Sequence, residues 1–259
     1  MREITSSQNS VVKGMRALKE ARVRAQQGRM LVEGEKMIRE AVSCGLTPFE
    51  TLIDAQKREK FASLAAWLAG KGAEVYFAPE RLIGAVSDTK TPQGAVAVFS
   101  LPVFPEAPGE KILALDAVQD PGNVGTIWRT ADAAGFSALY LGEGSADPYS
   151  PKVQRSAMGS AFRVPVKMGG LAGMLAALKK EGYQVVAGAL DGVDFAARPA
   201  LGRRLVIVIG NEARGVSPEV LALADVKLRL PMRGGAESLN AAVAAGILMY
   251  ALTVLEEGK

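Results

Sequence analysis

Two consecutive stretches near the end of the chain repeat one order of apolar and polar residues. Each opens with a predicted strand, an all-apolar run typical of a buried strand at residues 205–209 and a second strand at 226–230. A polar, glycine-bearing loop follows each run, and a helix start follows each loop. Ser217 and Pro218 open the first helix, because serine caps helices and proline suits the first turn. The second helix is rich in alanine and begins at 237–240. Since open α/β sheets bind ligands at the carboxyl ends of their strands, we expect a ligand site at these two loops.

Strand-like and helix-like patterns also alternate along the rest of the chain. In the front part, the apolar spacing predicts helices at 10–27, 36–44, 58–69 and 80–86, and strands at 30–32, 49–53, 75–78 and 95–99. In the rear part, it predicts strands at 112–115, 139–141, 164–167 and 184–189, and helices at 123–134, 152–159 and 171–181. We therefore predict an α/β protein, with a small α/β sandwich in front and a mostly parallel sheet behind.

A proline-rich segment separates the two parts. Pro102, Pro105 and Pro108 follow one another too closely for a helix or a central strand to continue. We therefore predict a front domain at 1–101, a linker at 102–110 and a rear domain at 111–259.

The composition excludes several kinds of catalytic and metal-binding site. The chain has 259 residues, 49% of them hydrophobic, with a single cysteine, Cys44, and no histidine. This excludes an internal disulfide, a histidine general base and the usual zinc or iron sites, so we expect no metal. The polar N-terminus does not resemble a signal peptide, and the longest apolar run, 241–255, is too short for a membrane span. We expect a cytoplasmic protein with no membrane partner.

The positive charge is concentrated at the front of the chain. Residues 1–30 hold seven Arg or Lys residues against two Glu residues, whereas the whole chain has a net charge of +4. A solvated helix face is the simpler explanation, and a surface for a polyanion is the alternative. The residues concerned are Lys13, Arg16, Lys19, Arg22, Arg24 and Arg29.

Three motifs of the rear part resemble, in order, those of the SpoU/TrmH-type RNA ribose 2′-O-methyltransferases of the SPOUT superfamily. They read DPGNVGTIWRTADAAGF at 120–136, GNEARGV at 210–216 and LPMRGGAESLNAAVAAG at 230–246, and the third is the most specific. Residues 6–41 and TPQGAVAVF at 91–99 resemble the L30e-like substrate-binding domain that precedes many members of that family.

The resemblance implies a fold, a cofactor and partners. It implies a trefoil knot in the C-terminal chain, S-adenosylmethionine as methyl donor without a metal, and a homodimer with its active site near the interface. The substrate it implies is RNA, with 23S ribosomal RNA favoured by the L30e-like domain and tRNA as the nearer alternative. The 2′-hydroxyl itself would distinguish RNA from DNA.

The motifs also imply roles for individual side chains. Arg129 matches the arginine thought to act on the ribose 2′-hydroxyl. Because arginine stays protonated in proteins, we expect it to hold the hydroxyl and the adjacent phosphate rather than act as a base. Taken alone, Asn123 and Ser238 are simple helix caps, and Glu212 is a cap or a partner of Arg214. The full catalytic set that the resemblance implies is Asn123, Arg129, Glu212, Ser238 and Asn240.

Two further sets concern binding. The motifs place the cofactor against Gly210, Leu230 and Leu239, with neighbours at Leu190, Ile209, Met232 and Ser238. If the basic front helix faces RNA, the candidate contacts are Lys13, Arg16, Arg22 and Arg29, joined by Arg2 and Glu33. Glu33 and Gly34 are equally well explained as the start of a helix.

Two rival classes of protein remain to be weighed. A non-catalytic RNA-binding or ribosome-assembly protein of the same fold would have no need of the five catalytic candidates. A nucleotide-dependent oxidoreductase would need a dinucleotide motif, and the sequence contains neither G-x-G-x-x-G with a downstream acid nor G-x-x-x-x-G-K-[ST].

Overall fold

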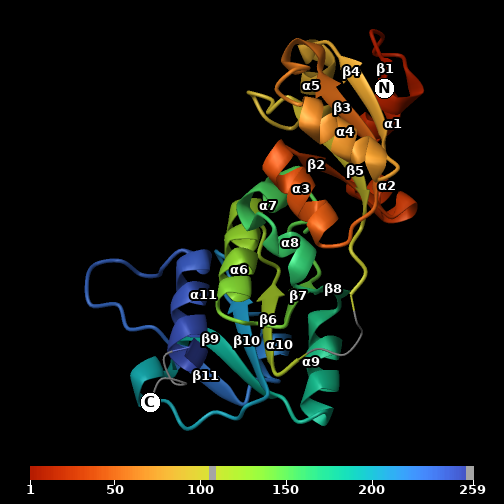
Figure 1. Cartoon of the computed structure of the whole chain (residues 1–259). Coiled ribbons are helices and arrows are strands. Elements are labelled where there is room, and N and C mark those ends of the chain that lie inside the picture. The colour runs from red at the N-terminus through yellow and green to blue at the C-terminus, as the bar shows by residue number, and fades with distance from the viewer. Residues whose placement is uncertain (105–108, 255–259) are drawn as a thin grey trace. The chain divides into compact units, whose positions relative to one another are not determined.

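The computed structural model describes residues 1–104 and 109–254 and divides into two compact α/β units (Figure 1). The first unit consists of Met1–Val103 and Tyr149–Phe162, and the second of Phe104–Pro148 and Arg163–Lys259. The chain therefore passes between the units three times. The linker predicted at 102–110 lies partly outside the described residues, as does the end of the apolar run 241–255.

The first unit contains a five-stranded mixed sheet in the order β1-β4-β3-β5-β2. Strand β5 is antiparallel to both β3 and β2, whereas β1, β4 and β3 are mutually parallel. The carboxyl ends of β1 to β4 therefore lie at one edge of the sheet, where β5 begins. The strands are β1 (Arg2–Glu3), β2 (Arg29–Glu33), β3 (Pro48–Asp54), β4 (Glu74–Ala78) and β5 (Ala95–Ser100).

Helices cover this sheet through apolar side chains. Val12, Met15 and Leu18 at α1, with Leu82 and Ile83 of α5, pack on one face together with residues of β2 to β5. The helices are α1 (Ser10–Ala17), α2 (Ala21–Gln27), α3 (Glu35–Ser43), α4 (Ala62–Gly70), α5 (Glu80–Val86), α7 (Pro151–Ala157) and α8 (Ser160–Arg163), with a 3₁₀ turn at Ala55–Lys57.

The single helix predicted at 10–27 was wrong, because the chain breaks between α1 and α2. The buried guanidinium of Arg24 explains the break. Its Nη1 donates to the carbonyl oxygens of Leu18 and Lys19, at 2.6 and 2.7 Å. Arg24 is therefore a structural residue that joins the two short helices.

The second unit contains six strands in the order β11-β9-β10-β6-β7-β8, and every neighbouring pair is parallel. The prediction of a mostly parallel sheet is confirmed. Such sheets are buried on both faces, which explains the continuous apolar run of β10. The strands are β6 (Lys111–Asp116), β7 (Ala138–Gly142), β8 (Val166–Gly169), β9 (Gln184–Asp194), β10 (Leu205–Gly210) and β11 (Val226–Arg229).

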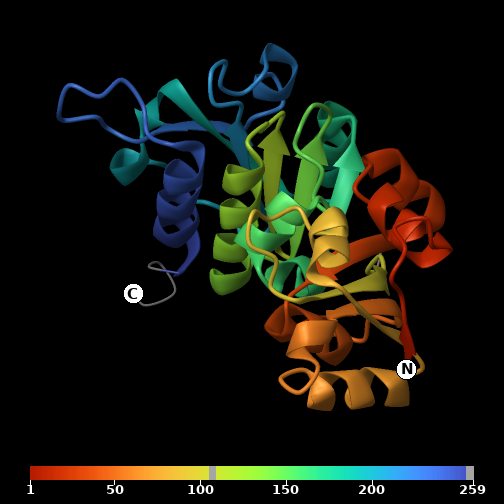
Figure 2. The same cartoon turned by 90° about the horizontal axis from the view of Figure 1, so that it is seen from above.

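Helices pack on both faces of the second sheet. Helices α6 (Pro121–Ala133) and α11 (Ala241–Met249) lie side by side on one face, as Figures 1 and 2 both show. Helices α9 (Leu171–Lys180) and α10 (Pro218–Leu221) pack against the other face through Leu175, Leu178 and Val220. A π-helical turn at Tyr250–Val254 follows α11.

Several predicted boundaries shift for physical reasons. The strand predicted at 184–189 continues to Asp194, because β11 pairs along it, and Gly192 lies so close to β11 that a Cβ would approach Lys227 O to 2.7 Å. The helix predicted from 237 begins at Ala241, after the cap Asn240. The helix predicted at 152–159 ends at Ala157, before Met158 with its φ of +54°, and a separate short helix, α8, begins at Ser160.

Two further expectations concern a knot in the chain and a membrane span. The trefoil knot that the resemblance implies stays a prediction. No helix in the part of the chain that the structure describes is long and apolar enough to cross a membrane.

Candidate active site and cofactor pocket

A pocket of about 710 Å³ lies at the carboxyl ends of β9, β10 and β11, within the size range of small-molecule sites. Segments 188–191, 209–216, 228–232 and 237–241 contribute to its walls. The seven residues predicted to bind the cofactor all line it: Leu190, Ile209, Gly210, Leu230, Met232, Ser238 and Leu239. The structure therefore brings the loops that follow the strands at 205–209 and 226–230 to one cavity.

The loop after β10 has a shape that its sequence dictates. Gly210 has no room for a side chain, since a Cβ would lie 2.1 Å from Gly215 C and Val216 N. Asn211 and Gly215 exchange backbone hydrogen bonds of 2.9 Å. The Asn211 side chain then accepts from the N–H groups of Ala213 and Arg214 and donates to Ala117 O at 2.8 Å. A closed, internally bonded turn thus forms one wall of the pocket.

Apolar side chains supply the other walls. Leu190 is 70% exposed although it is a leucine in a strand, and Leu239 is 38% exposed. With Ile209 they provide surfaces against which a flat aromatic ring can pack, while the loop backbones provide hydrogen-bonding groups for its edge.

A chain of hydrogen bonds joins the three sequence motifs beside this pocket. Asn123 Nδ2 donates to Glu212 Oε1 at 2.9 Å, and Asn240 Nδ2 donates to Asn123 Oδ1 at 3.0 Å. Asn240 Oδ1 in turn caps α11, accepting from Ala242 N and Val243 N. Because both ends of the Asn123 amide are engaged, its orientation is fixed by the other two motifs.

Glu212 is held in its charged form. Burial raises the pKa of Glu212, but the hydrogen bonds from Asn123 and from the backbone N–H groups of Glu212, Asp120 and Gln119 outweigh it and hold the pKa below its ordinary value. An ionised carboxylate can only accept hydrogen bonds, so it also determines which end of the Asn123 amide faces it. Glu212 makes no ion pair with Arg214 among the described residues, so the pairing with Arg214 considered from the sequence is wrong.

Arg129 lies two turns along α6 from the start of that helix and is not part of the pocket lining. Its side chain is exposed and makes no hydrogen bond or ion pair with any residue described by the structure. A planar cation without a protein partner keeps all of its donors available for a substrate. Ser238 lines the pocket and is exposed.

The two helix caps suggested by the sequence belong to other residues. Asp120 caps α6, and its carboxylate accepts from Asn123 N at 2.8 Å, while Asn240 caps α11. From the sequence, Asp116 had no role beyond a dispersed acidic cluster, whereas the structure buries it at the end of β6, where it accepts from Ser217 N at 2.6 Å. Its position directly after an apolar strand was the signal that could have identified it.

No group of acidic, cysteine or histidine side chains within 1–104 and 109–254 could hold a metal ion.

The basic residues of the front divide into two kinds. Lys13, Arg16, Arg22 and Arg2 are exposed, as an RNA-facing set requires. Arg29 instead lies over the Phe49 ring at 3.9 Å and 3.5 Å from Glu50, and Lys19 donates to the carbonyl oxygen of Ser87. Charge alone could not have separated these roles.

The pocket in a parallel sheet, bordered by the three linked motifs, defines a SPOUT-type methyltransferase. The chain belongs to the SpoU rRNA methylase family, whose model matches residues 110–250. The model of the MRM3-like substrate-binding domain matches residues 9–97. The predictions of a SpoU/TrmH-type methyltransferase and of S-adenosylmethionine as its cofactor are confirmed.

Individual relatives agree along nearly the whole chain. The 23S rRNA (guanosine(2553)-2′-O)-methyltransferase RlmP of Bacillus subtilis is 39% identical over 97% of this chain and 99% of its own. An AdoMet-bound rRNA methyltransferase from Sinorhizobium meliloti superposes with a TM-score of 0.84, at 33% identity and 96% of both chains. The SpoU methyltransferase AviRb from Streptomyces viridochromogenes, in complex with AdoMet, gives 0.82 at 27% identity, over 96% of this chain and 99% of that one.

Proposed function

We propose that the protein transfers the methyl group of S-adenosylmethionine to the 2′-hydroxyl of one ribose in 23S ribosomal RNA. The observation that carries the proposal is the hydrogen-bonded chain of Glu212, Asn123 and Asn240 beside the pocket. The relative from Bacillus subtilis, named as a 23S rRNA 2′-O-methyltransferase, supports the substrate because the similarity includes the front unit.

The residues present fit the cofactor. The pocket has the volume of a nucleoside site, apolar walls at Leu190, Ile209 and Leu239, and backbone groups in the loop after Gly210. The bound sulfonium supplies an already activated methyl group, so the protein's contribution is binding and orientation. Holding two reactants in line can supply much of the reduction in the barrier.

Arg129 is the proposed contact to the reacting ribose. Its unpaired guanidinium can hold the 2′-hydroxyl and the neighbouring phosphate together, and the hydroxyl proton leaves to that phosphate or to water. Asn123 is the proposed positioning group, since Glu212 and Asn240 fix its amide. Ser238 is proposed to hold the loop against the reactants.

We also propose a cytoplasmic homodimer. Val243, Ile247, Tyr250 and Val254 are each between 37% and 50% exposed, and their spacing places them on one face of α11 and the turn that follows. A contiguous apolar face of this kind marks an interface. Sedimentation should show a dimer for the wild type and a shift to monomer for Ile247→Glu, and a monomeric wild type would exclude the proposal.

The test of the function is the transfer of labelled methyl from S-adenosylmethionine to unmodified 23S rRNA and to tRNA, assayed separately. We expect label at a ribose 2′ position of 23S rRNA, and none with Arg129→Ala. Label in tRNA alone would replace the substrate with the tRNA alternative. Cofactor binding without label in either RNA would contradict the proposed substrate, and RNA binding without cofactor binding would favour the non-catalytic protein.

A further inference from the structure

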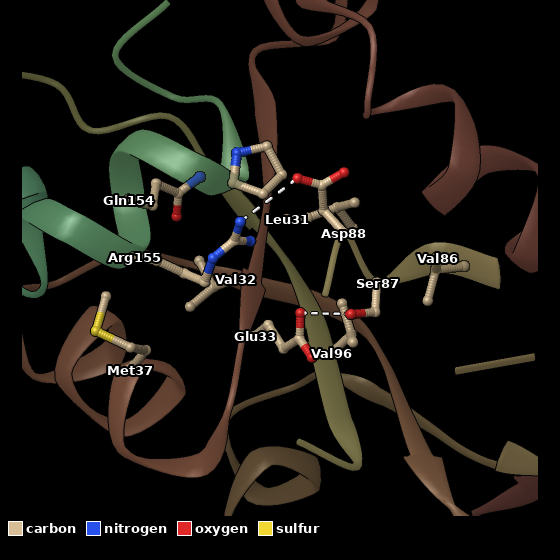
Figure 3. Close-up of a pocket in the computed structure, with 11 residues that line it drawn as sticks. Leu31, Val32, Glu33, Met37, Val86, Ser87, Asp88, Val96, Gln154 and Arg155 are labelled. Atoms are coloured by element: carbon tan, nitrogen blue, oxygen red, sulfur yellow. Dashed lines mark hydrogen bonds and ion pairs between the residues drawn. The ribbon is translucent and has the colours of Figure 1, made fainter. Parts of the chain in front are cut away.

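One carboxylate makes several contacts to the loop of residues 87–94, between α5 and β5. Glu33, the last residue of β2, accepts hydrogen bonds from Ser87 Oγ at 2.7 Å, Thr89 Oγ1 at 3.2 Å and Gln93 N at 3.0 Å. The three donors lie at the start, middle and end of the loop. Figure 3 shows the Glu33 side chain directed to Ser87. Glu33 therefore links three positions of the 87–94 loop to the end of β2.

Two glycines constrain the backbone here, Gly94 at the end of the loop and Gly34 directly after Glu33. Gly34 and Gly94 have φ values of +92° and +90°, which favour glycine. A Cβ on Gly34 would lie 2.1 Å from Gln93 Oε1, and a Cβ on Gly94 would lie 3.0 Å from Lys57 Cδ. The backbone at the end of the 87–94 loop and beside Glu33 is therefore restricted to glycine-like conformations.

A second residue holds the loop from a distant part of the sequence. Arg155 of α7 lies with Nη2 3.6 Å from Asp88 Oδ2, and both side chains are partly exposed. In Figure 3, Arg155 extends from α7 toward Asp88, next to the Glu33–Ser87 bond. Arg155 falls within the stretch matched by the SpoU methylase model, yet its segment, Tyr149–Phe162, belongs to the first unit.

The segment that carries Arg155 is seated closely on the first unit. A Cβ on Gly159, between α7 and α8, would lie 1.7 Å from Glu40 Oε1 of α3. Helix α7 also packs against β2. In the sequence this segment lies between β7 and β8, two strands of the second unit, and it meets the 87–94 loop through the Arg155–Asp88 ion pair.

The outer side of the loop presents groups that suit a nucleic acid backbone. Lys90, Thr91 and Gln93 are exposed, and Lys90 has no hydrogen bond or ion pair with the described residues. Ammonium, hydroxyl and amide donors are the groups that contact phosphate and ribose. The loop lies within residues 9–97, the part that matches a substrate-binding domain.

We propose that the 87–94 loop receives the RNA substrate through Lys90, and that Glu33 and Arg155 are positioning residues that hold the loop in its receptive form. This inference rests on the proposed function for the identity of the substrate. It assigns to a residue within the methyltransferase match a role in binding RNA rather than in methyl transfer.

The first experiment separates binding from chemistry in the full-length protein. Arg155→Ala should raise the KM for RNA about five- to tenfold while kcat and the cofactor's Kd stay within about twofold. Arg155→Lys should lose less, and Asp88→Arg combined with Arg155→Asp should recover most of the loss. Glu3→Gln, which breaks the exposed Glu3–Arg58 pair at the opposite edge of the sheet, is the matched control. An unchanged KM in Arg155→Ala, or a fall in kcat alone, would overturn the proposal.

The second experiment examines the loop surface directly through RNA binding. Lys90→Gln should weaken binding and reduce the slope of log affinity against log salt by about one counterion, as expected for a lost phosphate contact. Lys71→Gln, an exposed lysine at the end of α4, should leave the slope unchanged. An unchanged slope in Lys90→Gln would contradict the assignment of the loop. Because this readout needs no methyl transfer, it remains decisive for the loop if the proposed reaction itself fails.

Discussion

The two units differ in how their candidate binding residues are arranged. In the second unit, side chains from three separate motifs form one hydrogen-bonded chain beside a pocket, so each residue depends on the others. In the first unit, the basic residues proposed to contact RNA are exposed, while Glu33 and Arg155 contact the 87–94 loop. The comparison teaches that substitutions in the second unit should affect methyl transfer or cofactor binding, whereas those in the first should affect affinity for RNA.

The largest expected effect is at Arg129. Arg129→Ala should lower kcat by about 10²- to 10³-fold, the range seen when a group that stabilises a reacting centre is removed. Arg129→Lys should also be strongly impaired, because an ammonium cannot hold two oxygens in one plane. Single-turnover methyl transfer measures this, with cofactor affinity as the control. Near-normal turnover of Arg129→Lys would contradict a role for the guanidinium.

The next effect tests whether the chain of hydrogen bonds acts as one unit. Asn123→Ala should lower kcat about tenfold, and Asn123→Asp about 100-fold, because misplacement of a positioning group by about 1 Å can cost that much. The aspartate is worse because its carboxylate would face that of Glu212, at the position where the amide now donates. The Asn123→Ala variant should change little further when Asn240 is also replaced, and full additivity of the two losses would break the comparison.

A smaller effect is expected in the pocket wall. Leu190→Ala should weaken S-adenosylmethionine binding about five- to tenfold, since part of a leucine side chain would no longer pack on the cofactor. Val193→Ala is the matched control, because Val193 is an exposed residue of the same strand that does not line the pocket. Calorimetric titration measures both variants. Equal losses in the two would show that the strand, not the contact, determines affinity.

The sequence predicted what is local or carried by a motif. The strand β10 and the helix start at Ser217 are determined by residues adjacent in the sequence. Both predictions are confirmed. The extension of β9 to Asp194 depends on pairing with β11, and α7 joins the first unit through contacts with β2. Such partners are distant in the sequence, and local patterns cannot reveal them.

In the candidate site too, the sequence predicted the residues but not their contacts with distant partners. Motif matching selected Glu212, Asn123 and Asn240, but it could not show that the three are bonded to one another. The identity of the caps also escaped it, since Ser238 and Asn240 are both good cap residues and only the position of the first helical turn decides between them. In the first unit, charge suggested a binding face but could not reveal that Arg24, one of the basic residues, is buried.

The smallest expected effect concerns pH and stability. The pKa of Glu212 lies below its ordinary value because hydrogen bonds outweigh burial. A carboxyl group whose pKa is lower in the folded than in the unfolded state stabilises the fold fully above its unfolded pKa, which is about 4.3. This stabilisation is lost as the pH falls through the folded pKa. Because Glu212 is exposed, its contribution should be less than about 1 kcal/mol.

Urea unfolding of the wild type and of Glu212→Gln measures this contribution. The two proteins should differ most at neutral pH, and the difference should shrink below about pH 4 as Glu212 becomes protonated. Asp225→Asn provides the comparison: burial raises the pKa of Asp225, but its bonds with Lys179 and Val185 N lower it overall, and Asp225 does not line the pocket. Asp225→Asn should therefore show the same trend in stability with normal methyl transfer, whereas Glu212→Gln should also lose activity at neutral pH. A stability difference for Glu212→Gln that is independent of pH would show that its charge contributes nothing to the fold, and that only its geometry matters at the site.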